Sequence, residues 1–257
     1  MAFRFVPLGV GDAFTALHYS TCLALEAEGA LLLVDCPHPI QKMMREASLA
    51  VAGATLAPSR VSAVVLTHLH ADHCSGLEGL AFWTFFHERR RLPLYLHREV
   101  LDELWHGHLA AGMTHLLTAK GSANGPAVGV ERVRMSLDDY FEVHLLDEAR
   151  AVSCGPFSIE CRKTIHHVPT TALRVRAAGR TLGHSADTAF DESLIAWLQE
   201  ADLVVHETNH GVHTPYEKLA ALPAALRAKM RLVHYPDDFD VAASVIEPLR
   251  EGRIYEV

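Results

Sequence analysis

The sequence predicts an α/β protein with two β-layers flanked by helices. Strand-like and helix-like segments alternate along both halves of the chain, and strands mostly precede helices in each half, which argues against a helix bundle or an all-β barrel. The chain has 257 residues, of which 49% are hydrophobic, so it can bury a substantial core. Since no repeat, low-complexity tract or Pro/Ser-rich linker divides the sequence, we expect one domain spanning residues 1–257.

The first half begins with strands, and Glu28-Gly29 is expected to form a hairpin turn between two of them. Helical spacing follows and ends before Pro58, after which a β-branched run over 61–66 predicts a buried strand. The other expected segments of this half are strands at 3–8, 21–28, 30–35 and 92–96, helices at 39–51, 76–86 and 99–117, and a loop at 120–129.

The second half repeats this alternation without repeating the sequence. Residues 191–201 have one apolar helical face, and the TPYE segment at 214–217 has the pattern of a capping box with proline at the first helical position, so a helix is expected to begin there. The expected strands of this half lie at 140–146, 157–163, 173–178, 203–205 and 231–233.

Charge and composition exclude several classes of protein. The formal charge is −8, which argues against long nucleic acids as partners because Lys and Arg supply most of the affinity for phosphates. No apolar run approaches the roughly 18 residues of a membrane helix, so no membrane association is expected. The N-terminus lacks a secretory signal pattern and the five cysteines form no CxxC pair, so we expect a cytoplasmic protein with buried or free thiols.

Histidine is the outlier in the composition, with 18 residues in 257. The hexapeptide HLHADH at 68–73 directly follows an expected strand, and the chain's own composition gives only about 0.004 chance matches to its pattern. Imidazole and carboxylate groups are ligands that Zn²⁺ and similar ions prefer. A tight loop after a rigid strand can place four such side chains around two adjacent ions, so the hexapeptide predicts a metal site.

This hexapeptide resembles the signature of the metallo-β-lactamase-fold hydrolase superfamily, whose members form a four-layer αββα sandwich and usually have five motifs. The resemblance extends from about residue 3 to residue 234 and favours the ribonuclease Z and phosphodiesterase branch, as in IHHVPTTALRV at 165–175. SADT at 185–188 resembles the SGDT motif, and its Ala186 matters only if that position needs a positive φ. The remaining motifs match Asp35, which the resemblance makes a buttress of the metal loop, and His234.

The resemblance implies two divalent metal ions, zinc with manganese or iron as alternatives. His166 is preferred to His167 as a ligand because the proline of the motif falls three positions after it. The net charge of a centre with two divalent ions, two carboxylates and a bridging hydroxide is about +1. A small anionic substrate could therefore bind there although the protein as a whole is acidic. The first ion is expected at His68, His70, His166 and Asp187, and the second at Asp72, His73, Asp187 and His234.

Two further residues are catalytic candidates by resemblance. LVVHET at 203–208, followed by His213, is similar to a part of the ribonuclease Z branch in which a Glu–His pair beside the metals helps to protonate the leaving oxygen. Glu207 and His213 would form that pair, with His206 or His210 in support. Surface or helix-capping roles are the alternative for these residues.

Other histidines and one region stay unassigned. His184 could line the pocket or cap a strand or helix, and Cys74 is expected to be a packed thiol. The stretch at about 98–136 matches nothing in the family and is an insert without the glycine- and proline-rich arm with which long-form ribonuclease Z grips tRNA. Three histidines of this insert have no assigned role: His106, His108 and His115.

The motifs together favour a phosphodiesterase that acts on a small or cyclic nucleotide-like phosphodiester. The bridging hydroxide would attack phosphorus, Asp72 would orient it or take its proton, and His213 would protonate the leaving oxygen. One alternative is a diiron redox or oxygen-handling protein. The second alternative is a lactonase or other carbonyl-ester hydrolase, whose apolar pocket could be built from the insert with Phe82, Trp83, Phe85, Phe86 and Trp105. For the oligomeric state, analogy with this branch suggests a homodimer.

Overall fold

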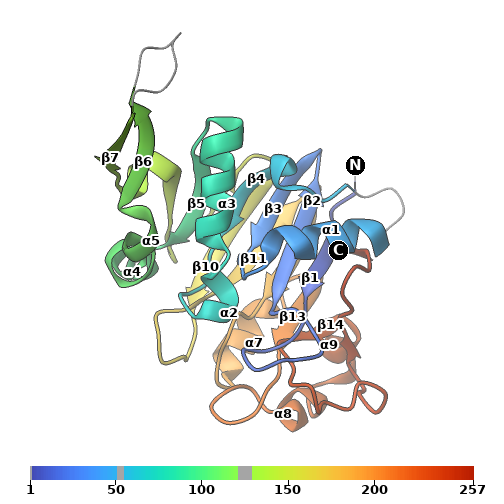
Figure 1. Ribbon diagram of the computed structural model, residues 1–257. Coiled ribbons are helices and arrows are strands. Elements are labelled where there is room, and N and C mark those ends of the chain that lie inside the picture. The colour runs from blue at the N-terminus through green and yellow to red at the C-terminus, as the bar shows by residue number, and fades with distance from the viewer. Residues whose placement is uncertain (1, 51–54, 121–128) are drawn as a thin grey trace.

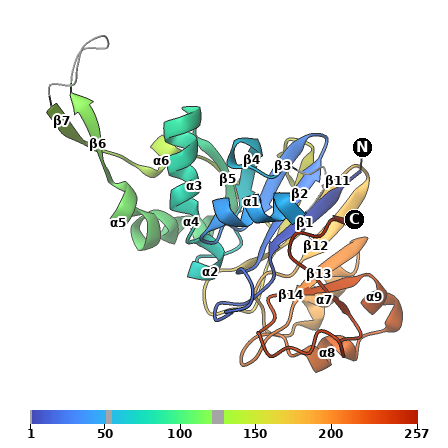
Figure 2. The same ribbon diagram turned by 45° about the vertical axis from the view of Figure 1, so that its right-hand side comes forward.

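The computed structural model describes residues 2–50, 55–120 and 129–257. Two seven-stranded sheets stack face to face, and helices cover the outer side of each sheet (Figure 1, Figure 2). The predicted four-layer αββα sandwich is therefore confirmed.

The first sheet has the strand order β16-β1-β2-β3-β4-β5-β8. It begins as an antiparallel meander whose Glu28-Gly29 turn has positive φ at both residues, 50° and 84°. From β3 to β8 neighbouring strands are parallel, so their carboxyl ends meet at one edge. The strands are β1 (Arg4–Gly9), β2 (Cys22–Ala27), β3 (Ala30–Val34), β4 (Val61–Val65), β5 (Leu92–His97), β8 (Phe141–Leu146) and β16 (Tyr255–Glu256).

The second sheet has the order β15-β14-β13-β12-β11-β10-β9 and the same change of direction. Strands β9 to β12 pair antiparallel, and β12 to β15 pair parallel. The carboxyl ends of β12, β13 and β14 therefore share an edge. The strands are β9 (Val152–Cys154), β10 (Phe157–Lys163), β11 (Thr171–Ala177), β12 (Arg180–His184), β13 (Leu203–Glu207), β14 (Met230–Val233) and β15 (Glu247–Pro248).

Apolar side chains fill two layers. One core lies between the sheets and extends under α7, with fully buried residues such as Phe5, Leu25 and Ile159. The other lies between the first sheet and helices α1 and α3, with Leu33 and Met44 among its members. The helices are α1 (Ile40–Ala50), α2 (Ala71–Cys74), α3 (Leu77–Trp83), α4 (Arg98–Glu103), α5 (Ala110–Met113), α6 (Leu137–Tyr140), α7 (Glu192–Leu198), α8 (Tyr216–Ala220) and α9 (Ala224–Ala228).

Short helical segments complete the fold. They are η1 (Pro58–Arg60), η2 (Thr84–Glu88) and η3 (Leu104–Leu109), of which the last two are π-helical. The five cysteines are buried and form no disulfide, as predicted. Among the described residues, no helix combines the length and the apolar character needed to cross a membrane.

Two expectations about helices are wrong. The helix expected over 99–117 ends at Met113, because residues 115–120 pair with 129–134 as a two-stranded sheet, β6 (His115–Lys120) and β7 (Gly129–Arg134). The capping box at Thr214 does not form, since the Thr214 hydroxyl donates to the Thr188 carbonyl at 3.0 Å and α8 begins at Tyr216 without a side-chain cap.

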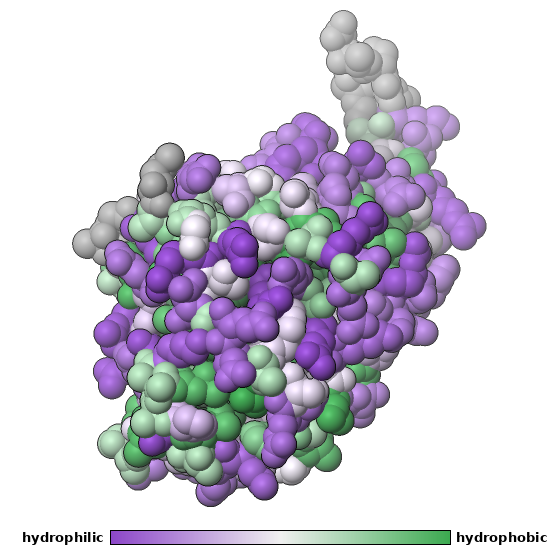
Figure 3. Space-filling view, turned by 180° about the vertical axis from the view of Figure 1, so that it is seen from behind, coloured by the Kyte–Doolittle hydropathy of each residue, from purple (hydrophilic) through white to green (hydrophobic). Residues whose placement is uncertain are grey.

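The β6–β7 hairpin stands outside the sandwich (Figure 2). Within the described part of the chain, its two strands pair only with each other, and they also project from the main body in the space-filling view (Figure 3). Leu117 and Val130 on these strands are 71% and 69% exposed. The expected loop at 120–129 falls mostly on residues 121–128, which lie outside the described residues.

Candidate metal centre

The expected ligands lie where strands of both sheets end. The loops after β4, β12 and β14 carry the hexapeptide, Asp187 and His234, and the loop between β10 and β11 carries His166. The two sheets are joined here by a backbone hydrogen bond of 3.2 Å from Thr171 to the carbonyl of Thr67. Chain segments more than 160 positions apart thus share one edge of the sandwich.

Four of the expected ligands form a first group. The ring nitrogens His68 Nε2 and His166 Nε2 lie 3.1 and 3.2 Å from His70 Nδ1. His68 Nε2 and His166 Nε2 lie 3.7 and 3.9 Å from Asp187 Oδ2. One donor atom from each residue falls within 4.8 Å of all the others, which is the spacing that one coordinated ion requires.

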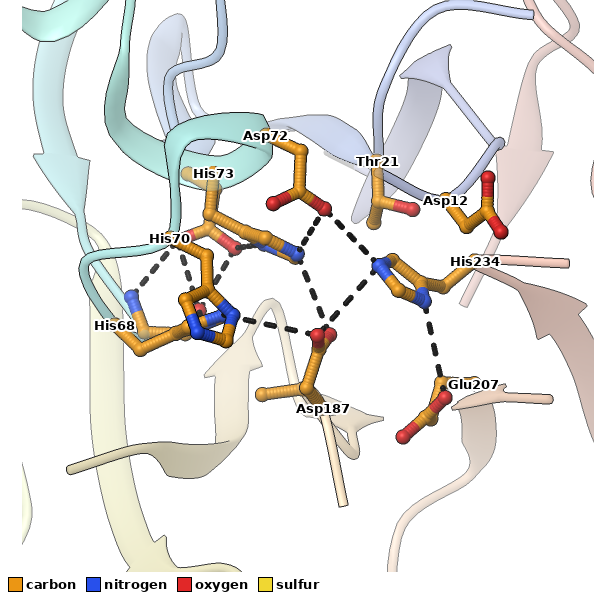
Figure 4. A network of polar contacts seen from close by, with 12 residues as sticks. Asp12, Thr21, His68, His70, Asp72, His73, Asp187, Glu207 and His234 are labelled. Carbon is orange, nitrogen blue, oxygen red and sulfur yellow. Dashed lines mark hydrogen bonds and ion pairs between the residues drawn. The ribbon is translucent and has the colours of Figure 1, made fainter. Parts of the chain in front are cut away.

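A second group is formed by the remaining ligands. Asp72 Oδ2 lies 3.3 Å from His73 Nε2 and 3.2 Å from His234 Nε2. Asp187 Oδ1 is 3.3 Å from His73 Nε2, and Asp187 Oδ2 is 3.5 Å from His234 Nε2. Figure 4 shows the Asp187 carboxylate between the two groups, where it can bridge two ions.

The polar atoms at the centre fit a metal better than they fit one another. His73 Nε2 and Asp187 Oδ2 are buried and make no hydrogen bond to any described residue, although groups of opposite charge lie 3.3–3.9 Å away. A buried polar atom without a hydrogen bond is costly, and divalent cations bind such imidazole and carboxylate atoms well. The residues present therefore suit a dinuclear site.

Asp35 holds the metal loop in place. This fully buried carboxylate accepts hydrogen bonds from Thr67 N at 2.8 Å, Thr67 Oγ1 at 2.8 Å and His73 Nδ1 at 2.7 Å. The bond to Nδ1 leaves Nε2 of His73 free to face the centre. Burial raises the pKa of Asp35 even though the charge and hydrogen bond of His73 act to lower it.

Thr67 orients a second ligand in the same way. Its hydroxyl donates to Asp35 and lies 2.9 Å from His68 Nδ1, so His68 can donate from Nδ1 and present an unprotonated Nε2. Burial, followed by the charge of His73, holds the pKa of His68 well below its usual value. A neutral imidazole is the form that binds a metal.

Three residues of the site have a left-handed backbone that side chains rarely adopt. Asp35, Ala186 and His234 have φ values of 63°, 50° and 57°. The position of Ala186 thus does need a positive φ, and this chain accepts the steric cost of a Cβ there. Such strain is typical of functional sites, where surrounding contacts fix the conformation.

An open pocket gives access to these ligands. Its volume is about 290 Å³, at the small end for a ligand site. His70, Asp72, Asp187, His213 and His234 all line it. A larger pocket of about 410 Å³ adjoins it at Asn209 but contains none of the expected ligands.

Comparison with known proteins assigns the chain to a family. The family model described as Anti-Pycsar protein Apyc1 matches residues 3–250. The chain belongs to the Apyc1 family. Among its relatives are Anti-Pycsar protein Apyc1 from Paenibacillus sp. (strain J14), which is 29% identical over 99% of both chains, and that of Bacillus phage BSP38, which is 27% identical over 96% of both.

Solved structures show that this Apyc1-family chain has the expected fold. The metallo-β-lactamase fold protein YhfI from Bacillus subtilis superposes with a TM-score of 0.72, 19% identity and full coverage of both chains. The short form of human tRNase Z gives 0.67, 21% identity and 98% coverage of both, and yeast PDE1 gives 0.70, 11% identity and full coverage of both. The resemblance to the ribonuclease Z and phosphodiesterase branch of the superfamily is confirmed.

The expected Glu207–His213 pair is formed in this member of the Apyc1 family. His213 Nδ1 lies 3.0 Å from both carboxylate oxygens of Glu207, and Thr188 N donates to Oε1 at 2.5 Å. Glu207 is buried, whereas the side chain of His213 is 18% exposed and faces the pocket. Burial is the largest single effect and opposes the charged form of His213. The hydrogen bond that His213 Nδ1 donates to Glu207 and the negative charges of Glu207 and Asp187 together outweigh burial and raise the pKa of His213.

The other histidines near the motifs have structural contacts. Buried His206 donates from Nδ1 to the carbonyl of Glu207 at 2.7 Å, and exposed His210 lies 3.2 Å from Asp238. His184 Nδ1 accepts from Ala186 N at 2.9 Å and so supports the loop that carries Asp187. None of the three lines the metal pocket.

Several pocket residues escape sequence analysis. Ala13, Phe14 and Asn209 line the metal pocket but belong to no motif. His167 also lines it and lies within the motif at 165–175, where His166 is the expected ligand. The aromatic residues that a lactonase pocket would use do not line it either: Phe82, Phe85 and Trp105 pack around Tyr140 instead.

Proposed function

We propose that this chain is a dinuclear metal-dependent phosphodiesterase that hydrolyses cyclic nucleotides. The predicted phosphodiesterase activity is confirmed by membership of the Apyc1 family, a family of cyclic nucleotide phosphodiesterases. The observation that carries the proposal is the hydrogen-bonded Glu207–His213 pair in the same pocket as the ligand cluster. A proton donor beside two metal positions is what cleavage of a phosphodiester to an alcohol requires.

The metal ligands are assigned as expected from the motifs. Zinc suits the mixture of imidazole and carboxylate groups, and manganese or iron could replace it. When bound, two such ions supply positive charge for the phosphoryl oxygens and lower the pKa of a water molecule. The assigned ligands are His68, His70, Asp72, His73, His166, Asp187 and His234.

Asp72 and His213 are assigned to proton transfer on the two sides of the reaction. The Asp72 carboxylate lines the pocket and can orient the attacking water or accept its proton. His213 can donate a proton to the departing sugar oxygen as the P–O bond breaks. Glu207 fixes the ring of His213 by holding Nδ1, so that Nε2 is the nitrogen left to act on substrate.

Size and charge support a small ligand. The metal pocket is small, and the chain carries a net charge of −8, so we infer a mononucleotide substrate and no long nucleic-acid partner. We also propose that residues 1–257 act as one domain, with residues 98–136 as an insert, and that the protein is a homodimer. Light scattering of the purified protein tests the last point.

A substrate panel tests the proposed activity. Protein loaded with Zn²⁺ or Mn²⁺ is incubated with 3′,5′-cyclic nucleotides, bis(p-nitrophenyl) phosphate and a lactone, with His68→Ala as the blank. We expect release of nucleoside monophosphate from the cyclic nucleotides and none with the blank. Turnover of the lactone alone would instead support a carbonyl-ester hydrolase.

A further inference from the structure

Phe14 occupies an unusual place at the wall of the metal pocket. Its side chain is 91% exposed, yet it lines the same pocket as His70, Asp72 and Asp187. Leaving a phenyl ring in water forgoes the free energy of burying it. An aromatic face open toward a site of small-molecule chemistry therefore calls for a ligand that covers it.

The loop that carries Phe14 is held in place by hydrogen bonds on both sides. Buried Asp12 accepts from Phe14 N at 2.9 Å through Oδ1 and from Asn209 Nδ2 at 3.0 Å through Oδ2. Asp237 accepts from Thr15 Oγ1 at 2.5 Å and from Ala16 N at 2.7 Å. Asn209 itself lines the metal pocket, and Asp237 lies three positions after the expected ligand His234, so the loop that carries the ring is tied to the site.

We propose that Phe14 is the platform on which the nucleobase of the substrate stacks while the cyclic phosphate lies at the ligand cluster. This inference rests on the proposed function, because only a nucleotide brings a planar base to the pocket. Every base has a π-face, so stacking on an aromatic ring binds purines and pyrimidines alike. Phe14 then contributes to affinity without selecting strongly among bases, and Asp12 and Asp237 are positioning residues.

Steady-state kinetics on two matched substrates tests this role. The substrates are a 3′,5′-cyclic nucleotide and the base-free ribose 3′,5′-cyclic phosphate, and the variants are Phe14→Ala, Phe14→Tyr and Leu17→Ala. Leu17 is a matched control because it is 71% exposed on the same loop but does not line the pocket.

We expect Phe14→Ala to raise KM for the nucleotide about tenfold, with kcat nearly unchanged. The base-free substrate should keep its KM in that variant. Phe14→Tyr should retain the wild-type KM for the nucleotide, since the ring is kept, and Leu17→Ala should behave as wild type on both substrates.

Fluorescence gives a readout that does not depend on turnover. In Phe14→Trp, a hydrolysis-resistant cyclic nucleotide phosphorothioate should quench the added tryptophan by stacking, whereas Leu17→Trp should show no such quenching. If Phe14→Ala is active and keeps the wild-type KM for the nucleotide, with or without a change in oligomeric state, Phe14 is not the platform. The proposed function would then still stand. Failure of the wild-type protein on every cyclic nucleotide would overturn the proposed function and the platform with it.

Discussion

The metal centre and the β6–β7 hairpin differ in how many contacts hold their residues in place. In the centre, buried Asp35 accepts three hydrogen bonds from Thr67 and His73, and ligands come from both sheets. In the hairpin, two strands form a sheet of their own, and Leu117 and Val130 are mostly exposed. Substitutions should therefore have large effects in the first region and small effects in the second, which the following variants test.

The largest effect is expected from Asp187→Ala. Asp187 has oxygens within 3.9 Å of ring nitrogens in both ligand groups, so its loss should weaken both metal positions. We expect kcat/KM for cyclic nucleotides to fall about a thousandfold or more, with less metal in elemental analysis. Asp191→Ala, which removes the cap of α7 outside the pocket, is the control and should keep both activity and metal.

His213→Ala should lower activity next, and in a way that depends on the leaving group. Loss of a general acid costs about a hundredfold when the leaving oxygen is a sugar alcohol. The better leaving group of bis(p-nitrophenyl) phosphate needs less protonation, so its turnover should fall much less. His210→Ala, on the same loop but exposed beside Asp238, is the control. Equal losses on both substrates would contradict a role in protonation.

Asp35→Asn should weaken metal binding although Asp35 is not one of the assigned metal ligands. The Asp35 carboxylate accepts from Thr67 N through Oδ1 and from His73 Nδ1 through Oδ2. Asparagine has one accepting oxygen and a donating NH2 group, so it cannot accept from both, and either the metal loop or His73 loses the partner that orients it. Such a partner contributes about 10- to 100-fold in metal affinity. Competition with a chelator dye measures it, and metal affinity equal to that of the wild type would show that the buttress is dispensable.

The metal centre and the hairpin also differ in how well the sequence predicts them. The ligands were predictable because ion coordination demands a few residue types, and HLHADH keeps them within six positions. Asp35 and His234 needed the family resemblance, since nothing local marks them. Phe14 and Asn209 could not be predicted, because pocket walls are set by loops that meet only in the folded chain. Residues 115–117, where the hairpin begins, are expected as the end of a helix because β6 and β7 lack the apolar alternation that predicts a strand.

Ala186→Gly should have a small effect inside the centre. A left-handed residue with a Cβ costs about 1–2 kcal/mol, and glycine removes that cost. Glycine also gives the unfolded chain more conformational entropy, which lowers the free energy of unfolding by about 0.4–1 kcal/mol. We expect the free energy of unfolding to rise by about 0.5 kcal/mol in urea titrations of metal-free protein. A loss of stability would mean that the buried methyl group packs more tightly than the backbone strain suggests.

The smallest effect is expected in the hairpin, from Leu117→Ser combined with Val130→Ser. Both side chains are already in water, so the free energy of unfolding should change by no more than about 0.5 kcal/mol. Turnover of a cyclic nucleotide should match the wild type, because neither 115–120 nor 129–134, the described parts of the hairpin, lines the metal pocket. Light scattering of the same variant separates two outcomes: an unchanged mass means that these side chains are dispensable for assembly, whereas a lower mass means that the exposed apolar residues belong to an interface between copies. A loss of turnover at unchanged mass would show that the hairpin acts on the site within one chain.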